Sequence, residues 1–133
     1  MYHKGAARRG PTSREAILMH AVARLALHPL ITNIQTSWVK MGPDGAALCL
    51  NAGANDLGGT LMNESISRAA GTQHGQEFPP EAMEGLIRSI GRVPLQRDTL
   101  YRPAAQERRV ASFDAPELAP VVQTPPRKML AAE

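Results

Sequence analysis

The sequence predicts an α/β fold, in which helices alternate with short buried strands. Helical patterns recur along the chain at three- and four-residue spacing, and two short runs with the features of strands lie between them. In order, the elements are helix, strand, helix, strand, helix and helix, which is the order of α/β units. The chain has 133 residues, of which 43% are hydrophobic and 20% charged, as is usual for one globular domain.

The first element is expected to be a helix that begins at Thr12 and runs to about His28. Thr12 and Glu15 have the spacing of a capping box, in which each side chain binds the other residue's free backbone N–H group. Three apolar residues of this segment share one helical face: Leu18, Val22 and Leu25. Pro29 ends the helix, because proline has no backbone N–H to continue it.

The next elements are two short strands with a short helix between them. Residues 31–39 are rich in β-branched side chains, which favours a strand. Residues 42–45 (Gly-Pro-Asp-Gly) predict a turn, and the apolar run over residues 46–51 predicts a helix. Gly53 ends that helix, and residues 54–57 are expected to form the second strand.

The second half of the folded part is expected to be helical. Gly58-Gly59 forms a loop, residues 61–70 form a helix and residues 71–78 form a further loop. A last helix starts at Pro79-Pro80, where proline is tolerated because the first helical N–H groups have no partner. Its apolar positions repeat with helical spacing: Met83, Leu86, Ile87 and Ile90. Gly91 has the position of a helix-ending glycine.

The chain is expected to divide into a folded part, residues 1–102, and a disordered Pro-rich tail, residues 103–133. The tail has no sustained hydrophobic period and is interrupted by five prolines: Pro103, Pro116, Pro120, Pro125 and Pro126. Two short parallel strands cannot cover their own edges. The sequence therefore predicts an incomplete α/β core that another segment completes.

Charge and cysteine content exclude several classes of protein. The formal net charge of +3 is small and spread along the chain, which argues against a nucleic-acid-binding protein. One cysteine, Cys49, cannot form an internal disulfide, and its apolar surroundings predict a small core residue. The four histidines (His3, His20, His28 and His74) lack the spacing of a metal site, so no metal is expected. Without an apolar membrane span or signal segment, the expected location is the cytoplasm.

The first group of candidate site residues lies on the expected strand over residues 31–39. Strand alternation places Gln35 and Ser37 on one face, and in a barrel strand both faces are buried. Buried polar side chains need partners, which are either a substrate or neighbouring protein groups and water. Trp38 is either a stacking wall for a flat ring or, as we expect, a core anchor.

The second group follows the expected second strand. Asn55 and Asp56 precede Gly58 and Gly59, which let a ligand approach the backbone closely, and Thr60 follows them. Active sites of α/β barrels lie at the carboxyl ends of strands, so these residues are candidates for substrate binding. In the alternative, Asp56 only satisfies local backbone N–H groups in an Asx turn.

Four strings of residues occur here in a defined order: IQTSWVKMG (34–42), GANDLGGT (53–60), ESISR (64–68) and QRDTLY (96–101). Over residues 10–102 the chain resembles the C-terminal third of the FO synthase (7,8-didemethyl-8-hydroxy-5-deazariboflavin synthase) family. The resemblance is to the half of that enzyme that joins tyrosine to a ribityl-aminouracil.

The resemblance implies an incomplete radical S-adenosylmethionine (β/α) barrel in deazaflavin coenzyme biosynthesis. In that family a 4Fe-4S cluster on three cysteines cleaves S-adenosylmethionine. The substrates are L-tyrosine and 5-amino-6-(D-ribitylamino)uracil. By resemblance, Gln35, Ser37, Asn55 and Asp56 face the substrate chamber. Because this chain has one cysteine, the missing N-terminal part of the barrel is the expected partner and holds the cluster.

Two other functions remain open. The first is a fragment of a related radical enzyme of the menaquinone route, aminofutalosine synthase or futalosine cyclase. The second is a non-catalytic half-barrel that binds a ligand. An upstream reading frame with the cluster cysteines would favour either of the enzyme fragments.

Overall fold

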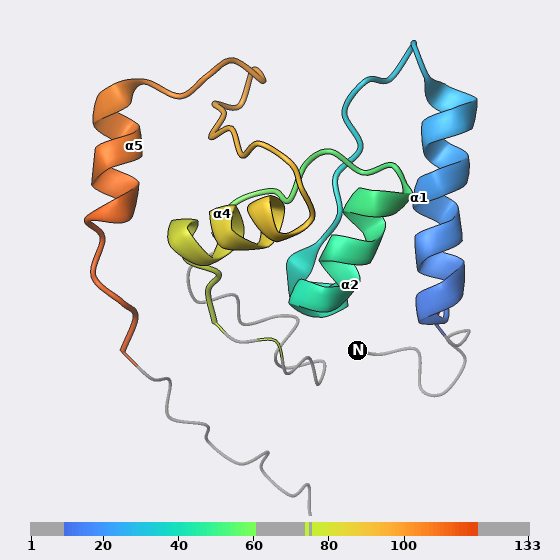
Figure 1. Cartoon of the computed structure of the whole chain (residues 1–133), viewed down its shortest axis with the longest axis horizontal. Coiled ribbons are helices and arrows are strands. Elements are labelled where there is room, and N and C mark those ends of the chain that lie inside the picture. Colours follow the sequence, from blue (N-terminus) through green and yellow to red (C-terminus); the bar gives the residue numbers. More distant parts are fainter. Residues whose placement is uncertain (1–9, 61–73, 75, 120–133) are drawn as a thin grey trace, which may run out of the picture.

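The described part of the chain is helical. A computed structural model describes residues 10–60, 74 and 76–119, and Figure 1 shows α5 and α1 at opposite ends with α2 and α4 between them. The four helices are α1 (Ser13–Leu27), α2 (Trp38–Ala52), α4 (Pro80–Ser89) and α5 (Gln106–Phe113). The expected helix over residues 61–70 lies outside the described residues.

Helix α1 forms as the sequence predicts. The Thr12 hydroxyl accepts a hydrogen bond from the Glu15 N–H at 3.2 Å, and the Glu15 carboxylate accepts one from the Thr12 N–H at 2.7 Å. The helix ends at Leu27, two residues before Pro29. Its expected apolar face points away from the core, however, since Leu18, Val22 and Leu25 are 58%, 53% and 83% exposed.

The expected strand over residues 31–39 is wrong, because α2 already begins at Trp38. Contact with the segment of the second expected strand is confined to one parallel bridge between Gln35 and Asp56. There the Thr36 N–H donates to the Asp56 carbonyl at 2.9 Å, and the Asn55 N–H donates to the Ile34 carbonyl at 3.0 Å. A single bridge gives no ladder, so the described residues contain no strand, in contrast to the α/β pattern of the sequence.

Helix α2 contains the expected turn as a kink. Gly42 has φ 70° and ψ 171°, which breaks the helix, and Pro43 starts the second stretch. That stretch includes the expected helix over residues 46–51 and ends, as predicted, at Gly53. The N–H of Gly53 caps the helix by donating to the carbonyls of Cys49 and Leu50.

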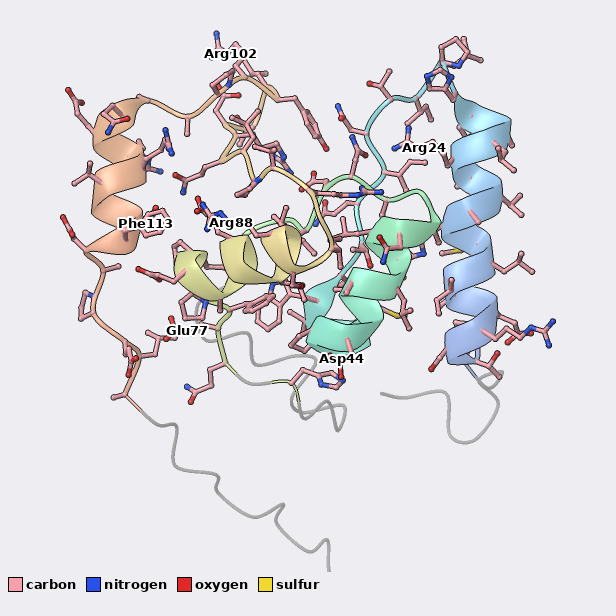
Figure 2. All side chains as sticks on the ribbon, in the orientation of Figure 1. Arg24, Asp44, Glu77, Arg88, Arg102 and Phe113 are labelled. Atoms are coloured by element: carbon pink, nitrogen blue, oxygen red, sulfur yellow. The ribbon has the colours of Figure 1, made fainter. Side chains whose placement is uncertain are left out.

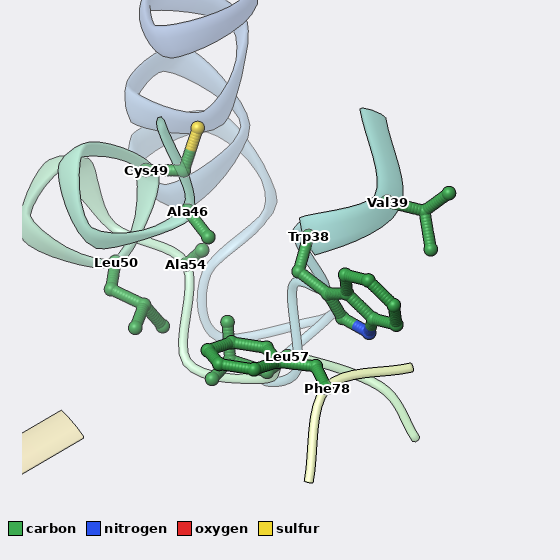
Figure 3. Close-up of a cluster of buried hydrophobic side chains, with 8 residues drawn as sticks. All are labelled: Trp38, Val39, Ala46, Cys49, Leu50, Ala54, Leu57 and Phe78. Carbon is green, nitrogen blue, oxygen red and sulfur yellow. The ribbon is translucent and has the colours of Figure 1, made fainter. Parts of the chain in front are cut away.

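The core lies between α2 and the segments that follow it (Figure 3). Eight buried apolar residues form it: Trp38, Val39, Ala46, Cys49, Leu50, Ala54, Leu57 and Phe78. Trp38 has the largest of the fully buried side chains, and its ring centroid lies 5.5 Å from that of Phe78 at an interplanar angle of 57°. The predictions that Trp38 is a core anchor and Cys49 a core residue are confirmed.

Helix α4 also follows the sequence prediction. Its apolar side chains pack half-buried against the core: Met83, Leu86, Ile87 and Ile90. Gly91 has φ +73°, a left-handed conformation that glycine adopts without strain, and its N–H donates to the Arg88 carbonyl at 2.9 Å. The helix therefore ends as expected for a glycine-terminated helix.

Helix α5 is a correction to the expected tail. Gln106–Phe113 is helical, although residues 103–133 were expected to lack regular structure. This short helix packs against α4, and the Ser112 hydroxyl accepts a hydrogen bond from the Gln96 amide at 2.9 Å. Beyond α5, the Leu118 N–H donates to the Glu77 carboxylate at 3.1 Å. Residues 120–133 lie outside the described residues, and the division at residue 102 remains a prediction.

Large apolar side chains remain exposed over much of the described surface. Leu30 and Val93 are 90% and 92% exposed, and α1 presents its apolar stripe outward. Several exposed apolar side chains on one helical face, as on α1, indicate a place where another polypeptide or a ligand packs. No helix in the described part of the chain has both the length and the apolar character needed to span a membrane.

Candidate functional site

A cavity of about 640 Å³ lies between the segment after α2, helix α4, the segment after α4 and helix α5. This volume is typical of small-molecule sites. Five of the seven predicted site residues line it: Asn55, Asp56, Gly58, Gly59 and Thr60. The opposite walls carry Met83 and Ile87 from α4 and Phe113 from α5. Figure 2 shows Phe113 on the side of α5 that faces α4.

Gln35 and Ser37 do not line this cavity. Gln35 was expected on a doubly buried strand, yet its side chain is exposed and lies over the backbone of Gly58. Ser37 is the N-cap residue of α2, where its carbonyl accepts a hydrogen bond from the Met41 N–H at 3.0 Å and its side chain makes no capping bond. Both corrections follow from the loss of the expected strand, since strand alternation no longer sets the direction of these side chains.

The Asn55 side chain is held entirely by protein groups. Its Oδ1 accepts hydrogen bonds at 2.8 Å from both the Arg24 guanidinium and the Ile34 N–H, and its Nδ2 donates to Asn33 at 3.1 Å. Arg24 also donates to the carbonyls of Gly53 and Thr32, each at 2.8 Å. Arg24 therefore ties α1 to both sides of the parallel bridge, and Asn55 fixes the wall of the cavity.

Asp56 makes both a local turn and a long-range ion pair. Its Oδ1 accepts from the Gly58 N–H at 2.8 Å, which is the Asx turn of the alternative interpretation. Its Oδ2 accepts from Nε and Nη2 of Arg97 at 3.1 and 2.5 Å. The Asp56 side chain is 7% exposed and that of Arg97 28% exposed, so the pair is largely removed from water.

Arg97 was missed as a site residue, although it lies in the QRDTLY string. It is 41 residues from Asp56, and no spacing rule connects residues that far apart. Its guanidinium carbon also lies 4.2 Å from the centroid of the Tyr101 ring, within the range of a cation–π contact.

Residues 97–103 form a compact loop that presents Arg97. Arg97 and Pro103 form an antiparallel bridge at the base of the loop. The Asp98 carboxylate accepts hydrogen bonds from the N–H groups of Leu100 at 2.8 Å and Arg102 at 3.0 Å. These bonds lower the pKa of Asp98, with the Arg102 N–H as the largest cause. The bonds to the ionised carboxylate therefore stabilise the loop above the unfolded-state pKa, and this contribution is lost as pH falls through the folded-state pKa.

Gly58 and Gly59 differ in what they require of the backbone. Gly58 has φ +76°, and a Cβ there would lie 2.3 Å from Nε2 of Gln35. A Cβ placed at Gly59 would have no neighbouring heavy atom within 4 Å. The Gly59 carbonyl accepts a hydrogen bond from Nε1 of Trp38 at 2.9 Å.

We expect Gly58→Ala to destabilise the chain by about 1–2 kcal/mol from its left-handed conformation alone. Displacement of Gln35 would add to this cost. Gly59→Ala is the matched control and should change the free energy of unfolding by less than about 0.5 kcal/mol. Urea denaturation of the two variants measures the difference, and equal losses would contradict the assigned backbone conformation.

The residues of this chain do not form a site for the iron–sulfur cluster that the family resemblance implies. Such clusters are held by several cysteine thiolates. Cys49 is the single cysteine, and its side chain is fully buried in the core between apolar residues. The cavity is lined by apolar side chains together with carboxylate, amide and guanidinium groups, which suit an organic ligand with polar substituents.

Comparison with known proteins agrees with the family resemblance. The chain is 53% identical over 103 residues to the 5-amino-6-(D-ribitylamino)uracil--L-tyrosine 4-hydroxyphenyl transferase of Methanopyrus kandleri, which covers 77% of this chain and 28% of that protein. It is 49% identical over 126 residues to the FO synthase of Streptomyces coelicolor. The aligned residues are 92% of this chain and 14% of that protein. No solved structure gave a significant match.

The chain thus spans less than a third of the length of these relatives. The family described as the CofH/MqnC C-terminal region matches residues 3–110, which include the cavity wall at residues 55–60 and the Arg97 loop. The match extends over most of the chain, and the chain belongs to this family.

Proposed function

We propose that this chain is the C-terminal, substrate-binding part of a radical S-adenosylmethionine transferase. The reaction joins a 4-hydroxybenzyl group from L-tyrosine to 5-amino-6-(D-ribitylamino)uracil in deazaflavin coenzyme biosynthesis. The observation that carries the proposal is identity of about half over most of the chain to proteins named for this reaction. The proposed location is the cytoplasm.

The cavity supplies the binding surface in this proposal. Asp56 offers an acceptor carboxylate, and Gly58 and Gly59 let a ligand approach the backbone next to Thr60. Asn55 holds this wall in place through its bonds to Arg24 and Ile34. Gln35 and Ser37 act behind the wall, Gln35 by covering Gly58 and Ser37 by starting α2.

Activity requires the remaining length of the relatives, on the same polypeptide or on another. The exposed apolar stripe of α1 and the single parallel bridge are surfaces that a completed barrel would cover. In the proposal that remaining part, the N-terminal portion of the barrel, also holds the 4Fe-4S cluster and S-adenosylmethionine, because Cys49 is enclosed in the core.

The 133-residue chain alone should show no S-adenosylmethionine cleavage after treatment with iron and sulfide. The physical reason is the absence of a cluster-binding set of thiolates from its sequence. Formation of 5′-deoxyadenosine, measured by chromatography, checks this expectation. Appreciable 5′-deoxyadenosine formation by the chain alone would overturn the proposal that the N-terminal part holds the cluster.

The same assay with added N-terminal part of the Methanopyrus kandleri relative tests the function itself. The expected result is product formation from L-tyrosine and the ribitylaminouracil that needs both polypeptides. Turnover of a menaquinone-route substrate instead would assign the chain to the related enzymes. No turnover with any substrate, despite stable association, would favour the non-catalytic binding protein.

A further inference from the structure

Asp56 and Gln96 place hydrogen-bond acceptors on the cavity wall. Asp56 accepts three bonds within the protein, one from Gly58 and two from Arg97. A carboxylate has about four acceptor positions, so Asp56 retains capacity for one more donor. Arg97 directs its Nη1 to the carbonyl of Asp98 at 3.1 Å, and the other arginine of the cavity wall, Arg92, directs its Nη1 to the carbonyl of Ala54 at 3.1 Å.

Gln96 supplies a second acceptor in the same cavity wall. The Ser112 hydroxyl donates to the Arg109 carbonyl at 2.8 Å, so it can only accept from Gln96. This fixes Nε2 of Gln96 toward Ser112 at 2.9 Å and turns Oε1 to the other side. That Oε1 is buried and has no hydrogen-bond partner among the described residues. A buried carbonyl oxygen without a donor is costly unless a ligand or water satisfies it.

Arg97 is held in place before any ligand arrives. The bridge to Pro103 and the bond to the Asp98 carbonyl fix its backbone and one side of its guanidinium. Tyr101 has φ +61°, a left-handed conformation that is uncommon for a residue other than glycine and that clusters at functional sites. This conformation accompanies the placement of the Tyr101 ring against the guanidinium of Arg97.

We propose that Arg97 is a positioning residue that makes Asp56 an oriented acceptor within a charge-neutral pair. Arg97 holds Oδ2, the Gly58 N–H holds Oδ1, and the remaining lone pair of Asp56 and the free oxygen of Gln96 receive donors from the ligand. Because Arg97 neutralises the carboxylate, the pair selects an uncharged ligand rich in hydroxyl and N–H donors rather than a cation.

This inference rests on the proposed function and names the substrate of this wall. Of the two compounds in the relatives' names, 5-amino-6-(D-ribitylamino)uracil carries many hydroxyl and N–H donors and no net charge. L-Tyrosine carries an ammonium, which the neutralised pair does not select, and a carboxylate, which cannot bind to the acceptor oxygens of Asp56 and Gln96. The ribitylaminouracil is therefore the ligand of Asp56, Arg97 and Gln96.

Direct binding to the 133-residue chain tests the inference without turnover. Calorimetric titration with ribitylaminouracil and, separately, with L-tyrosine is made on the wild type, Arg97→Met, Arg97→Lys and Asp56→Asn. We expect ribitylaminouracil affinity to fall about tenfold or more in Arg97→Met, as for loss of a charge-assisted bond, and to recover in part in Arg97→Lys. Arg14→Met is the matched control, because Arg14 is exposed on α1 and does not line the cavity, and this variant should bind normally.

Thermal melting of each variant separates positioning from folding. In the proposal, the affinity of the folded protein falls in Arg97→Met, and adding Asp56→Asn to it causes little further loss because the two residues act as one unit. A lowered Tm with unchanged affinity of the folded fraction would overturn the proposal in favour of a purely structural ion pair. Tighter binding of L-tyrosine, or no binding of ribitylaminouracil by the wild type, would overturn the assigned ligand. Failure of the two-polypeptide activity assay alongside normal binding would count against the proposed reaction alone.

Discussion

Replacing Trp38 with alanine should lower the free energy of unfolding by about 3–5 kcal/mol, as for other fully buried aromatic residues. The Trp38 side chain is 1% exposed, packs against Phe78 and donates from its indole N–H to the Gly59 carbonyl. Single domains are stable by only about 5–15 kcal/mol, so this loss removes a large part of the total. Urea denaturation followed by circular dichroism measures it.

Trp38→Phe separates the packing of the ring from its hydrogen bond. It keeps an aromatic ring beside Phe78 but leaves the Gly59 carbonyl without the indole donor. We expect a smaller loss, about 1–3 kcal/mol. A change of less than about 1 kcal/mol in Trp38→Ala would show that this core is not what holds the chain together.

Replacing Gly53 with alanine should also have a large effect, and should lower the free energy of unfolding by about 3 kcal/mol or more. Gly53 has φ +134°, where L-residues are strained, and a Cβ there would lie 2.7 Å from Cβ of Arg24. Relief of this contact requires Arg24 to move, which breaks its bonds to Gly53, Thr32 and Asn55. The single methyl group therefore disturbs both the end of α2 and the cavity wall.

Gly91→Ala is the matched control for this variant. Gly91 also follows a helix and has φ +73°, yet nothing lies within 4 Å of a Cβ placed there. The expected cost is about 1–2 kcal/mol, from the backbone conformation alone. The free energies of unfolding of the two variants measure the contribution of crowding, and equal values would contradict the role given to Arg24.

The helices α1 and α4 could be predicted because their signals are local. The Thr12–Glu15 box, Pro80 and Gly91 each act within one helical turn. Local signals could not decide whether residues 31–39 form a strand, because a strand also needs a neighbouring strand to pair with. Here the segment of Asp56 supplies only one bridge. Helix α5 has eight residues, too few to be stable alone, and its contacts with α4 and Gln96 have no local signal.

The candidate site could be predicted in part for the same reason. Asn55, Asp56 and Gly58 are adjacent in sequence, so their common place on the cavity wall follows from their spacing. The prediction that the Gln35 side chain is buried was wrong, because it assumed alternation along a strand that does not form. The charge partner of Asp56 depends on the tertiary fold, which brings Arg97 to it from 41 residues away.

The enclosure of Cys49 gives the protein a built-in chemical reporter. It is the single thiol of the chain, and its side chain is fully buried on α2. A thiol reagent can reach it only when α2 opens away from the core, so the rate of labelling measures how often that opening occurs. A polypeptide that docks on α1 and stabilises the closed form will slow this labelling, and no second cysteine of the chain will obscure the signal.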